Sequence, residues 1–332
     1  RGQLAPRYSL LDFSLFVSFF PQLVAGPSVR ASYFLPQCTE PRRATADAMG
    51  WGLALVAFGL FAKIVLADSV LAPIADAVFG APDTVGTFDA WLGVFAFSGQ
   101  IFFDFSGYST CAIGAAMCLG FALPDNFRSP YAAIGFSDFW QRWHISLSQW
   151  LRDYLYISLG GNRRGSARTF VNLVVTMFLG GLWHGASWMF VIWGLLHGFY
   201  LVIEHAAKSL VGDLAVFRLH SVRVALGLLT FVVVSMTWVF FRAPDMAVAT
   251  TMLTTMTTPT ETGSLVFVER LPVIGFVLLG LLGWHWTTRN SNLEHVFEQL
   301  SIWLRVLIIS AVVVTIIFSG GGAQHAFIYF QF

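Results

Sequence analysis

A histidine inside a long apolar stretch is the side chain best suited to chemistry in this sequence. His184 belongs to the segment GLWHGASW, which begins at Gly181 and interrupts about 35 otherwise apolar residues. Burying an ionisable ring is costly, so a histidine at this depth is treated first as a functional residue. An imidazole suits base catalysis because its ordinary pKa, about 6.5, lies near neutral pH. The alternative is a packing role, in which the buried ring bonds a neighbouring carbonyl.

A second histidine, His144, stands in a segment with helical periodicity. Large apolar residues recur at helical spacing between positions 136 and 154, which predicts one amphipathic helix with a single apolar face. Such a helix would lie in the membrane interface or pack across a helix bundle. His144 falls at the edge of the apolar stripe. It is either an interfacial histidine satisfied by a neighbour or a polar group aimed into a cavity.

Small and polar residues lead toward His184 along one helix face. Asn172, Thr176 and Gly180 step by four in the sequence, so they share a face of the helix. We expect Asn172, Thr176 and Trp183 to line a substrate path, and we add Arg152 as a further substrate contact. The same pattern is also typical of two closely packed helices, because small residues let helix backbones touch.

Other kinds of reactive site have weaker support. No Ser-His-Asp or Cys-His set is evident, so direct transfer to a hydroxyl fits better than a covalent enzyme. His197 and His205 are eight residues apart, wider than the usual spacing of metal ligands on one helix, and Glu204 faces differently, so we expect no metal site. The turn at 160–165, GGNRRG, is either a basic turn on the cytoplasmic side or a landing site for coenzyme phosphates. It lacks the other features of a P-loop.

The elements that position these residues must be membrane helices. Of the 332 residues, 56% are hydrophobic and 11% are charged, against roughly 25% charged in a soluble domain. A net charge of +1 offers no attraction to nucleic acid. At about 20 residues per span, the chain can cross a bilayer some seven to nine times. The apolar runs are 48–67, 88–122, 169–183, 185–203, 222–241, 271–286 and 301–319, with a further candidate at 9–26 that Pro21 interrupts and that is either bent or re-entrant.

Basic residues predict the orientation of these spans. Arg42 and Arg43 precede the run 48–67, whereas the segment 68–89 carries only acidic charges, so the first end is cytoplasmic and the second faces outward. Six arginines make 123–168 the densest basic segment, and it is therefore expected on the cytoplasmic side. Two full crossings within 88–122 would put that segment outside. We therefore expect part of 88–122 to be re-entrant or to lie flat, which is a weak indication of a cavity.

Several long motifs give the sequence a family resemblance. It resembles the membrane-bound O-acyltransferase (MBOAT) family, in the branch of the bacterial alginate O-acetylation proteins, and is more distantly similar to the teichoic-acid D-alanylation membrane protein. The resemblance covers nearly the whole chain, and the blocks around His144 and His184 are highly specific together. The matching segments are FVSFFPQLVAGP from Phe16, IFFDFSGYS from Ile101, LGFALPDNFRSPY from Leu119, FWQRWHISLSQWLRDYLYISLGGNR from Phe139, GLWHGASW from Gly181, WGLLHG from Trp193 and the closing FIYFQF.

The resemblance implies a fold and an activity. The fold would be all-α, a polytopic ring of tilted transmembrane helices in which re-entrant and amphipathic helices surround a central tunnel. His184 would be the general base acting on an acceptor hydroxyl, and His144 the second family histidine. The acyl donor would be acetyl-CoA or an acyl carrier thioester on the cytoplasmic side, with no bound cofactor. Residues 1–332 would form a single domain, the C-terminal part of a longer protein whose N-terminal spans are missing here.

The expected protein is a multi-pass acyltransferase of a bacterial inner membrane. It would transfer an acyl group, most simply acetyl, to an exported polysaccharide or to a periplasmic acetyltransferase partner. Two departures from the family pattern, Thr110 with Cys111 and Ser158, leave the polymer unassigned. The rival hypotheses are a membrane transporter, which predicts paired intramembrane charges and internal symmetry, and a non-catalytic scaffold for a periplasmic transferase. The clearest candidate charges are Lys63 and Asp104.

Overall fold

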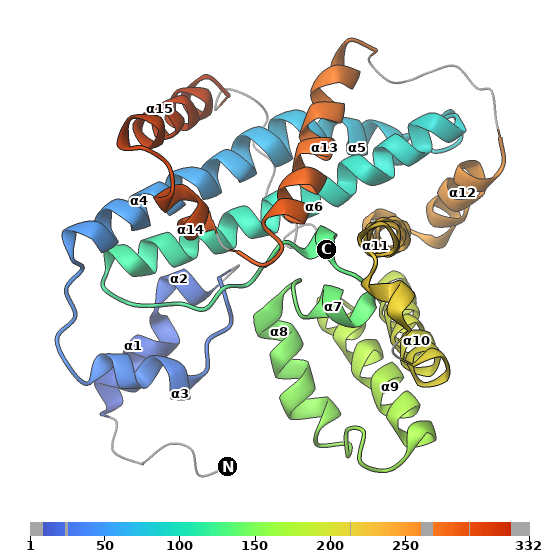
Figure 1. The fold of residues 1–332 in the computed structure, drawn as a ribbon, viewed down its shortest axis with the longest axis horizontal. Helices are drawn as coiled ribbons and strands as arrows, with labels where there is room; N and C mark the ends of the chain where they lie inside the picture. Colours follow the sequence, from blue (N-terminus) through green and yellow to red (C-terminus); the bar gives the residue numbers. More distant parts are fainter. Residues whose placement is uncertain (1–8, 24–25, 213, 260–267, 292, 320–332) are drawn as a thin grey trace.

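The regular structure of the chain is helical. A computed structural model describes residues 9–23, 26–212, 214–259, 268–291 and 293–319, and every regular element within these ranges is a helix. The closing FIYFQF motif lies outside the described residues. Figure 1 shows the helices in two groups, with the helices of residues 46–118 and 271–319 on one side and those of residues 145–211 on the other.

The longest pair of helices forms the frame of the first group. Helix α4 (Ala46–Leu60) runs through a π-helical segment (Phe61–Leu71) into α5 (Ala72–Gly80), and α6 (Thr87–Cys118) returns beside it. Glycines bring the backbones together: a Cβ at Gly52 would lie 2.7 Å from the carbonyl oxygen of Gly114, and one at Gly107 would lie 2.7 Å from that of Gly59. These close approaches hold α6 in register against α4.

A buried ion-pair cluster joins the π-helical segment to α6. The Lys63 ammonium lies 2.5 Å from a carboxylate oxygen of Asp104 and 2.9 Å from one of Asp68. The intramembrane charges singled out from the sequence are therefore paired with each other. Asp68 was expected in an outward loop and is instead part of the helix, because the helix continues to Gly80 rather than ending near position 67.

The run 88–122 forms one helix and not a re-entrant pair. Helix α6 is continuous for 32 residues, so the expectation of a segment that enters and returns here is wrong. With one crossing at α6, the acidic turn before it and the basic segment 123–168 fall on opposite ends of the helix. The conflict in the predicted topology disappears because the apolar run is one long helix and not two short ones.

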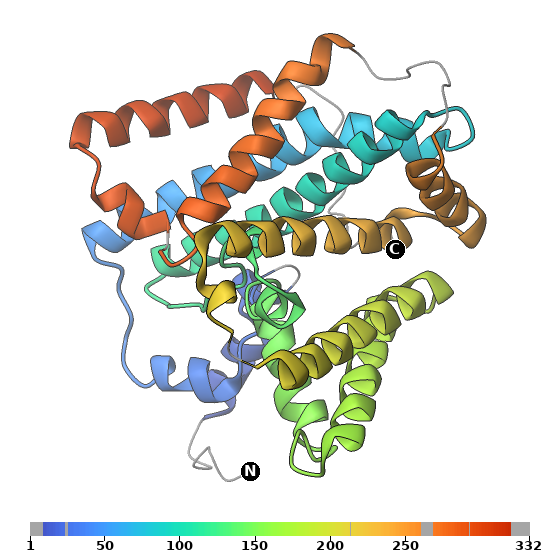
Figure 2. The ribbon, with the colours of Figure 1, turned by 45° about the vertical axis from the view of Figure 1, so that its right-hand side comes forward.

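The second group is built on a helical hairpin. Helix α9 (Ser166–His184) and α10 (Trp188–Val211) lie side by side (Figure 2). Helix α11 (His220–Arg242) contacts both α10 and α6 and so joins the two groups. Apart from α7 (Phe136–Trp140) and α8 (Ile145–Trp150), the other α-helices of the described residues are α1 (Leu10–Ser18), α2 (Phe20–Leu23), α3 (Ala31–Phe34), α12 (Met246–Thr257), α13 (Leu271–Thr287), α14 (Leu293–Glu298) and α15 (Ile302–Ser319).

Five helical stretches in the described part are long and apolar enough to cross a membrane. They are Ala46–Gly80, Thr87–Cys118, Trp188–Leu210, His220–Arg242 and Ile302–Ser319, so the protein is an all-α polytopic membrane protein. The predicted runs at 169–183 and 271–286 also form helices, α9 and α13. Neither is among the five: α13 has only 17 residues, and the apolar sequence of α9 contains several buried polar side chains. In the candidate run at 9–26, expected to be bent or re-entrant because of Pro21, two short helices meet at Phe19, and Pro21 lies inside the second.

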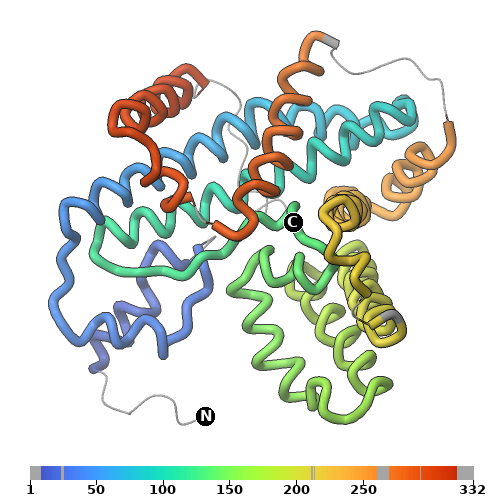
Figure 3. Tube along the Cα trace, in the orientation of Figure 1, coloured from blue at the N-terminus to red at the C-terminus, as the bar shows by residue number. Residues whose placement is uncertain are grey.

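The amphipathic helix predicted for 136–154 is broken in two. Helix α7 (Phe136–Trp140) ends before a turn, and α8 (Ile145–Trp150) continues as a π-helical segment to Tyr156 (Figure 3). The break is at His144, whose φ of 43° lies in the left-handed region. A non-glycine residue in this conformation costs of order 1–3 kcal/mol, which the surrounding contacts must offset. The break turns the side chain of His144 inward, and the residue is only 4% exposed.

Candidate active site

His184 is the last residue of α9 and lies among aromatic rings. Its ring centroid is 5.2 Å from that of Trp193 on α10 and 5.2 Å from that of Phe241 on α11, both in edge-on contacts. The ring of Phe190 lies 6.1 Å away. Gly185 ends the helix directly after the histidine. The imidazole is therefore held by three helices at the point where the chain turns from α9 into α10.

Two glycines fix the distance between the helices of this hairpin. A Cβ at Gly181 would lie 2.3 Å from the carbonyl oxygen of Phe190, and one at Gly194 would lie 2.5 Å from that of Met177. Glycine is required at these positions because the opposing backbone occupies the space of a side chain. Gly181 and Gly194 thus serve close packing of α9 against α10, whereas a Cβ at Gly180, the glycine of the predicted strip, would face the side chain of Leu151. They also fix where His184 lies relative to Phe190.

His144 reaches the same region from the opposite side. Its Nδ1 lies 3.2 Å from Oδ1 of Asn126, and its ring meets that of Phe105 on α6 edge-on with centroids 4.7 Å apart. The indole of Trp183 contacts both histidines, with its centroid 6.0 Å from the ring of His144 and 5.0 Å from that of His184. Two histidines 40 positions apart in the sequence thus converge on one tryptophan.

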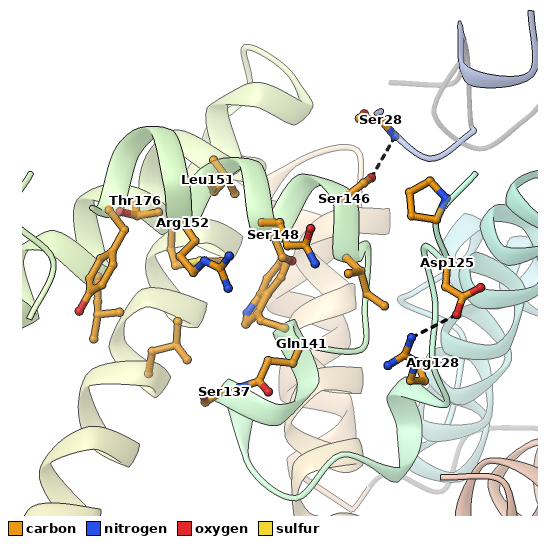
Figure 4. A pocket seen from close by; sticks show the side chains of 18 of the residues that line it. Ser28, Asp125, Arg128, Ser137, Gln141, Ser146, Ser148, Leu151, Arg152 and Thr176 are labelled. Carbon is orange, nitrogen blue, oxygen red and sulfur yellow. Dashed lines mark hydrogen bonds and ion pairs between the residues drawn. The ribbon is translucent and has the colours of Figure 1, made fainter. Parts of the chain in front are cut away.

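A cavity of about 1140 Å³ opens beside α8, α9 and α10. Figure 4 shows side chains from these helices and from the loops at Ser28 and Asp125 facing into it. Its charged lining comprises Arg30, Arg128, Arg152, Lys208, Asp125 and Glu204.

The cations of this cavity are paired but remain accessible. Arg152 and Arg30 both bind Asp153, at 2.8 Å and 2.5 Å. These hydrogen bonds, with that of Arg152 first, hold the pKa of Asp153 below its ordinary value, so its carboxylate stays ionised at neutral pH. The side chain of Arg152 is 61% exposed and that of Lys208, paired with Glu204, is 69% exposed. Exposed pairs exchange partners at little cost, so these cations can turn to an anionic ligand.

Residues of the cavity wall lie close to both histidines. Ile145 and Ser146, the two residues after His144, line the cavity. Trp140 also lines it, and its ring meets that of Trp193 with centroids 5.8 Å apart. Trp193 in turn contacts His184. The rings of Trp140 and Trp193 therefore lie between the cavity and His184, whereas His144 directly precedes two residues of the cavity wall.

The residues predicted to contact substrate are distributed over this site. Arg152 and Thr176 line the cavity (Figure 4). Trp183 lies at the histidines. Asn172 does not line the cavity: it is buried, and its amide donates to the carbonyl oxygens of Gly161, at 2.9 Å, and Leu159, at 3.4 Å. Asn172 therefore holds the glycine-rich turn against α9, and the adjacent Asn162 of that turn is part of the cavity wall.

The two other histidines of α10 lie in different environments. His197 is fully buried with its Nε2 3.0 Å from Oγ1 of Thr237, whereas His205 lines the cavity. In the described parts of the chain, no group of three His, Cys, Asp or Glu side chains is arranged to hold a metal ion. None of Lys63, Asp68 and Asp104 lines the cavity.

Sequence reasoning missed two residues that build the site. Asn126 lies in the motif LPDNFRSPY and holds His144. Glu204 accepts hydrogen bonds from the backbone N–H groups of Phe136 and Ser137, at 2.5 Å and 2.9 Å, and so anchors the start of α7 to α10. Glu204 interrupts an apolar run, which was the available signal, whereas Asn126 stands among other polar residues such as Asp125 and Arg128. Their partners could not be foreseen because each lies far away in the sequence.

Comparison with known proteins identifies the fold around these histidines. The family model described as "MBOAT, membrane-bound O-acyltransferase family" matches residues 3–243. This chain belongs to that family. The matched range contains both histidines, the cavity and α4 to α11, whereas α12 to α15 lie beyond its end at residue 243.

Curated relatives match most of the length of this chain. The chain is 46% identical over 256 residues to a probable alginate O-acetylase AlgI of Azotobacter vinelandii, covering 77% of this chain and 50% of the relative. It is 42% identical over 245 residues to a peptidoglycan O-acetyltransferase of Helicobacter pylori, covering 73% and 46%. It is 31% identical over 227 residues to a teichoic acid D-alanyltransferase of Streptococcus thermophilus, covering 62% and 52%. The chain spans about half the length of these relatives.

Proposed function

We propose that this chain carries the catalytic histidines of a membrane O-acyltransferase of the bacterial inner membrane. The enzyme moves an acyl group, most simply acetyl, from a cytoplasmic thioester to a hydroxyl of an exported polysaccharide or of a periplasmic relay partner. The observation that supports this most strongly is the convergence of His144 and His184 on Trp183, close to the wall of a basic cavity. The names of the alginate and peptidoglycan relatives support the acceptor class.

The basic cavity is the proposed entry site of the acyl donor. It lies among elements of the segment 123–168, which carries six arginines and is assigned to the cytoplasmic side. Coenzyme A and the phosphopantetheine of an acyl carrier are both anionic. Arg152 and Lys208 are exposed enough to bind their phosphates, and a planar guanidinium binds phosphate through two hydrogen bonds.

The proposed chemistry is direct acyl transfer. His184 takes the proton of the attacking hydroxyl as its oxygen forms a bond to the thioester carbonyl carbon. The carbon–sulfur bond then breaks, and the thiol leaves with a proton. General base catalysis of this kind contributes about 10²–10⁴ to the rate. A thin barrier between cavity and histidines suits this reaction because donor and acceptor arrive from opposite faces of the membrane.

A variant in the natural protein separates the enzyme hypothesis from the scaffold hypothesis. His184→Ala should abolish O-acyl esters on the exported polymer while the protein remains at its normal level in the membrane. His295→Ala, at an exposed site on α14, is the matched control and should leave ester content unchanged. Normal ester content in His184→Ala would show that the chain acts as a scaffold or transporter and would overturn the assignment.

A further inference from the structure

Asn126 is the centre of a buried hydrogen-bond cluster on which His144 depends. It follows α6 in the loop that leads to α7, and its residue is 1% exposed. Its Oδ1 lies 3.2 Å from Nδ1 of His144, 3.3 Å from the backbone nitrogen of Ser146 and 2.9 Å from Oγ of Ser146. Its Nδ2 donates to Oγ of Ser109 on α6, at 3.1 Å. The backbone carbonyl of Asn126 accepts from the N–H of Ile145, at 2.9 Å.

The orientation of the Asn126 amide follows from a partner that can act in only one way. A backbone N–H donates and never accepts, so the side-chain atom facing the nitrogen of Ser146 must be the oxygen. The hydroxyl of Ser146 accepts from the backbone N–H of Ser28, at 3.1 Å, and can give its own hydrogen to Oδ1. All partners of this oxygen are therefore donors.

The tautomer of His144 follows from the orientation of Asn126. An amide oxygen has no hydrogen to give, so Nδ1 of His144 must carry the hydrogen in this contact. In the neutral ring the other nitrogen, Nε2, then holds the lone pair. Burial against Phe105 favours the neutral ring, because desolvation disfavours charge. The backbone of His144, fixed in the left-handed conformation, leaves the ring little freedom to turn away from Asn126.

We propose that Asn126 is a positioning residue that holds His144 as the Nδ1–H tautomer, so that His144 acts on the reactants through the lone pair of Nε2. His144 then accepts the hydrogen bond of the acceptor hydroxyl and orients it. It does not donate a hydrogen bond to the thioester oxygen. This inference rests on the proposed acyl transfer and divides the roles of the two histidines: His184 removes the proton, and His144 aligns the group that loses it.

The same cluster connects the tautomer to the cavity wall. Ser28 and Ser146 both line the cavity, and their hydrogen bond is drawn in Figure 4. The N–H of Ser28 donates to the hydroxyl of Ser146, and that hydroxyl donates to Oδ1 of Asn126. The same oxygen also accepts the hydrogen bond from Nδ1 of His144. The wall beside the donor site and the imidazole thus share one acceptor atom.

The direct test reads the tautomer itself. In purified full-length protein with ¹⁵N-labelled histidine, the nitrogen shifts of His144, assigned by their loss in His144→Gln, should show a protonated Nδ1 and an unprotonated Nε2. Asn126→Ala should populate the other tautomer. Ser109→Ala removes only the hydrogen bond that Nδ2 of Asn126 donates to Ser109, so His144 should keep its Nδ1–H tautomer. An unprotonated Nδ1 in the unaltered protein, or an unchanged tautomer in a folded Asn126→Ala, would overturn the proposal.

Kinetics separate positioning from a structural role. Asn126→Ala should lower kcat at least about tenfold with little change in KM for the thioester. Asn126→Asp keeps an oxygen acceptor for Nδ1–H and should restore the tautomer if Asn126→Ala does not fold. Its carboxylate would stabilise a charged His144, so the acidic limb of the pH–rate profile should move to higher pH. An unshifted pH–rate profile in an active Asn126→Asp variant would contradict the contact between residue 126 and His144. The nitrogen shifts do not depend on turnover, so failure of the acyltransferase assignment would be recognised separately, in His184→Ala.

Discussion

The indole of Trp183 packs against the imidazole of His184 with ring centroids 5.0 Å apart and ring planes 81° apart. The same indole reaches His144, so one side chain contacts both proposed reacting groups. Trp183 is 56% exposed, so its removal costs little folding free energy.

Replacing Trp183 should therefore impair catalysis more than stability. We expect Trp183→Ala to lower acyl transfer about tenfold or more, because both rings lose a shared neighbour and their alignment. Trp183→Phe should retain part of the activity. Trp188→Ala, at a position that is 80% exposed on α10, is the control. Equal activity of Trp183→Ala and Trp188→Ala would show that the indole contact has no catalytic role.

Arg152 should determine affinity for the anionic donor. Arg152→Gln is expected to raise KM for an acyl-CoA or acyl-carrier donor about fivefold while kcat changes little, because the lost interaction is the same in the bound substrate and the transition state. The increase should shrink at high salt, which screens exposed charges. Arg168→Gln changes an exposed arginine of the same basic segment that does not line the cavity, and it should leave KM unchanged. Equal effects of the two variants would argue against a donor site here.

The close approach of α9 and α10 predicts that Gly181→Ala is damaging. The added methyl group would overlap the carbonyl of Phe190, so the two helices must separate and His184 must move relative to its aromatic neighbours. We expect acyl transfer to fall by about a hundredfold, the cost of misplacing a reacting group by about 1 Å. Gly50→Ala, where no atom lies within 4 Å of the added Cβ, should be harmless. Full activity in Gly181→Ala would mean that helix spacing does not set the position of His184.

The Lys63 cluster predicts a stability effect without a direct catalytic one. Lys63→Met leaves the buried carboxylate of Asp104 and the partly buried one of Asp68 without their shared cation, and removing one partner of a buried ion pair typically costs about 3–5 kcal/mol. Combining Lys63→Met with Asp68→Asn and Asp104→Asn should recover much of that loss, because no unpaired charge remains. Thermal unfolding in detergent measures both variants. A triple variant no more stable than the single one would contradict the explanation.

The spans and the family were predictable from the sequence, whereas the shape of the site was not. Apolar runs predicted most of the helices, because this signal is local. The length of α6 was harder to judge, since an apolar run of 35 residues fits either one tilted helix or two short segments. The break at His144 escaped the periodicity, because Trp143 and Leu147 keep helical spacing on either side of a left-handed residue.

Contacts between distant segments explain the other differences. Asn172 carries the pattern of a tunnel residue, but its amide is taken by carbonyls of the glycine-rich turn. Asn126 has no periodicity to distinguish it, and it matters only because the fold places it beside Ser146 and His144. Such pairings depend on the fold placing the loop at Asn126 between α6 and the start of α8, which no local pattern encodes.

Transfer of labelled acyl groups in membrane vesicles tests the central claim most directly. Inverted inner-membrane vesicles that contain the natural protein, its polymer and any periplasmic partner would be supplied with radiolabelled acetyl thioester on the cytoplasmic face. Alkali-labile label should accumulate on the acceptor with the unaltered protein and with His295→Ala, and should fall at least about a hundredfold with His184→Ala at equal protein level. Undiminished transfer by His184→Ala would contradict the assignment of His184 as the catalytic base.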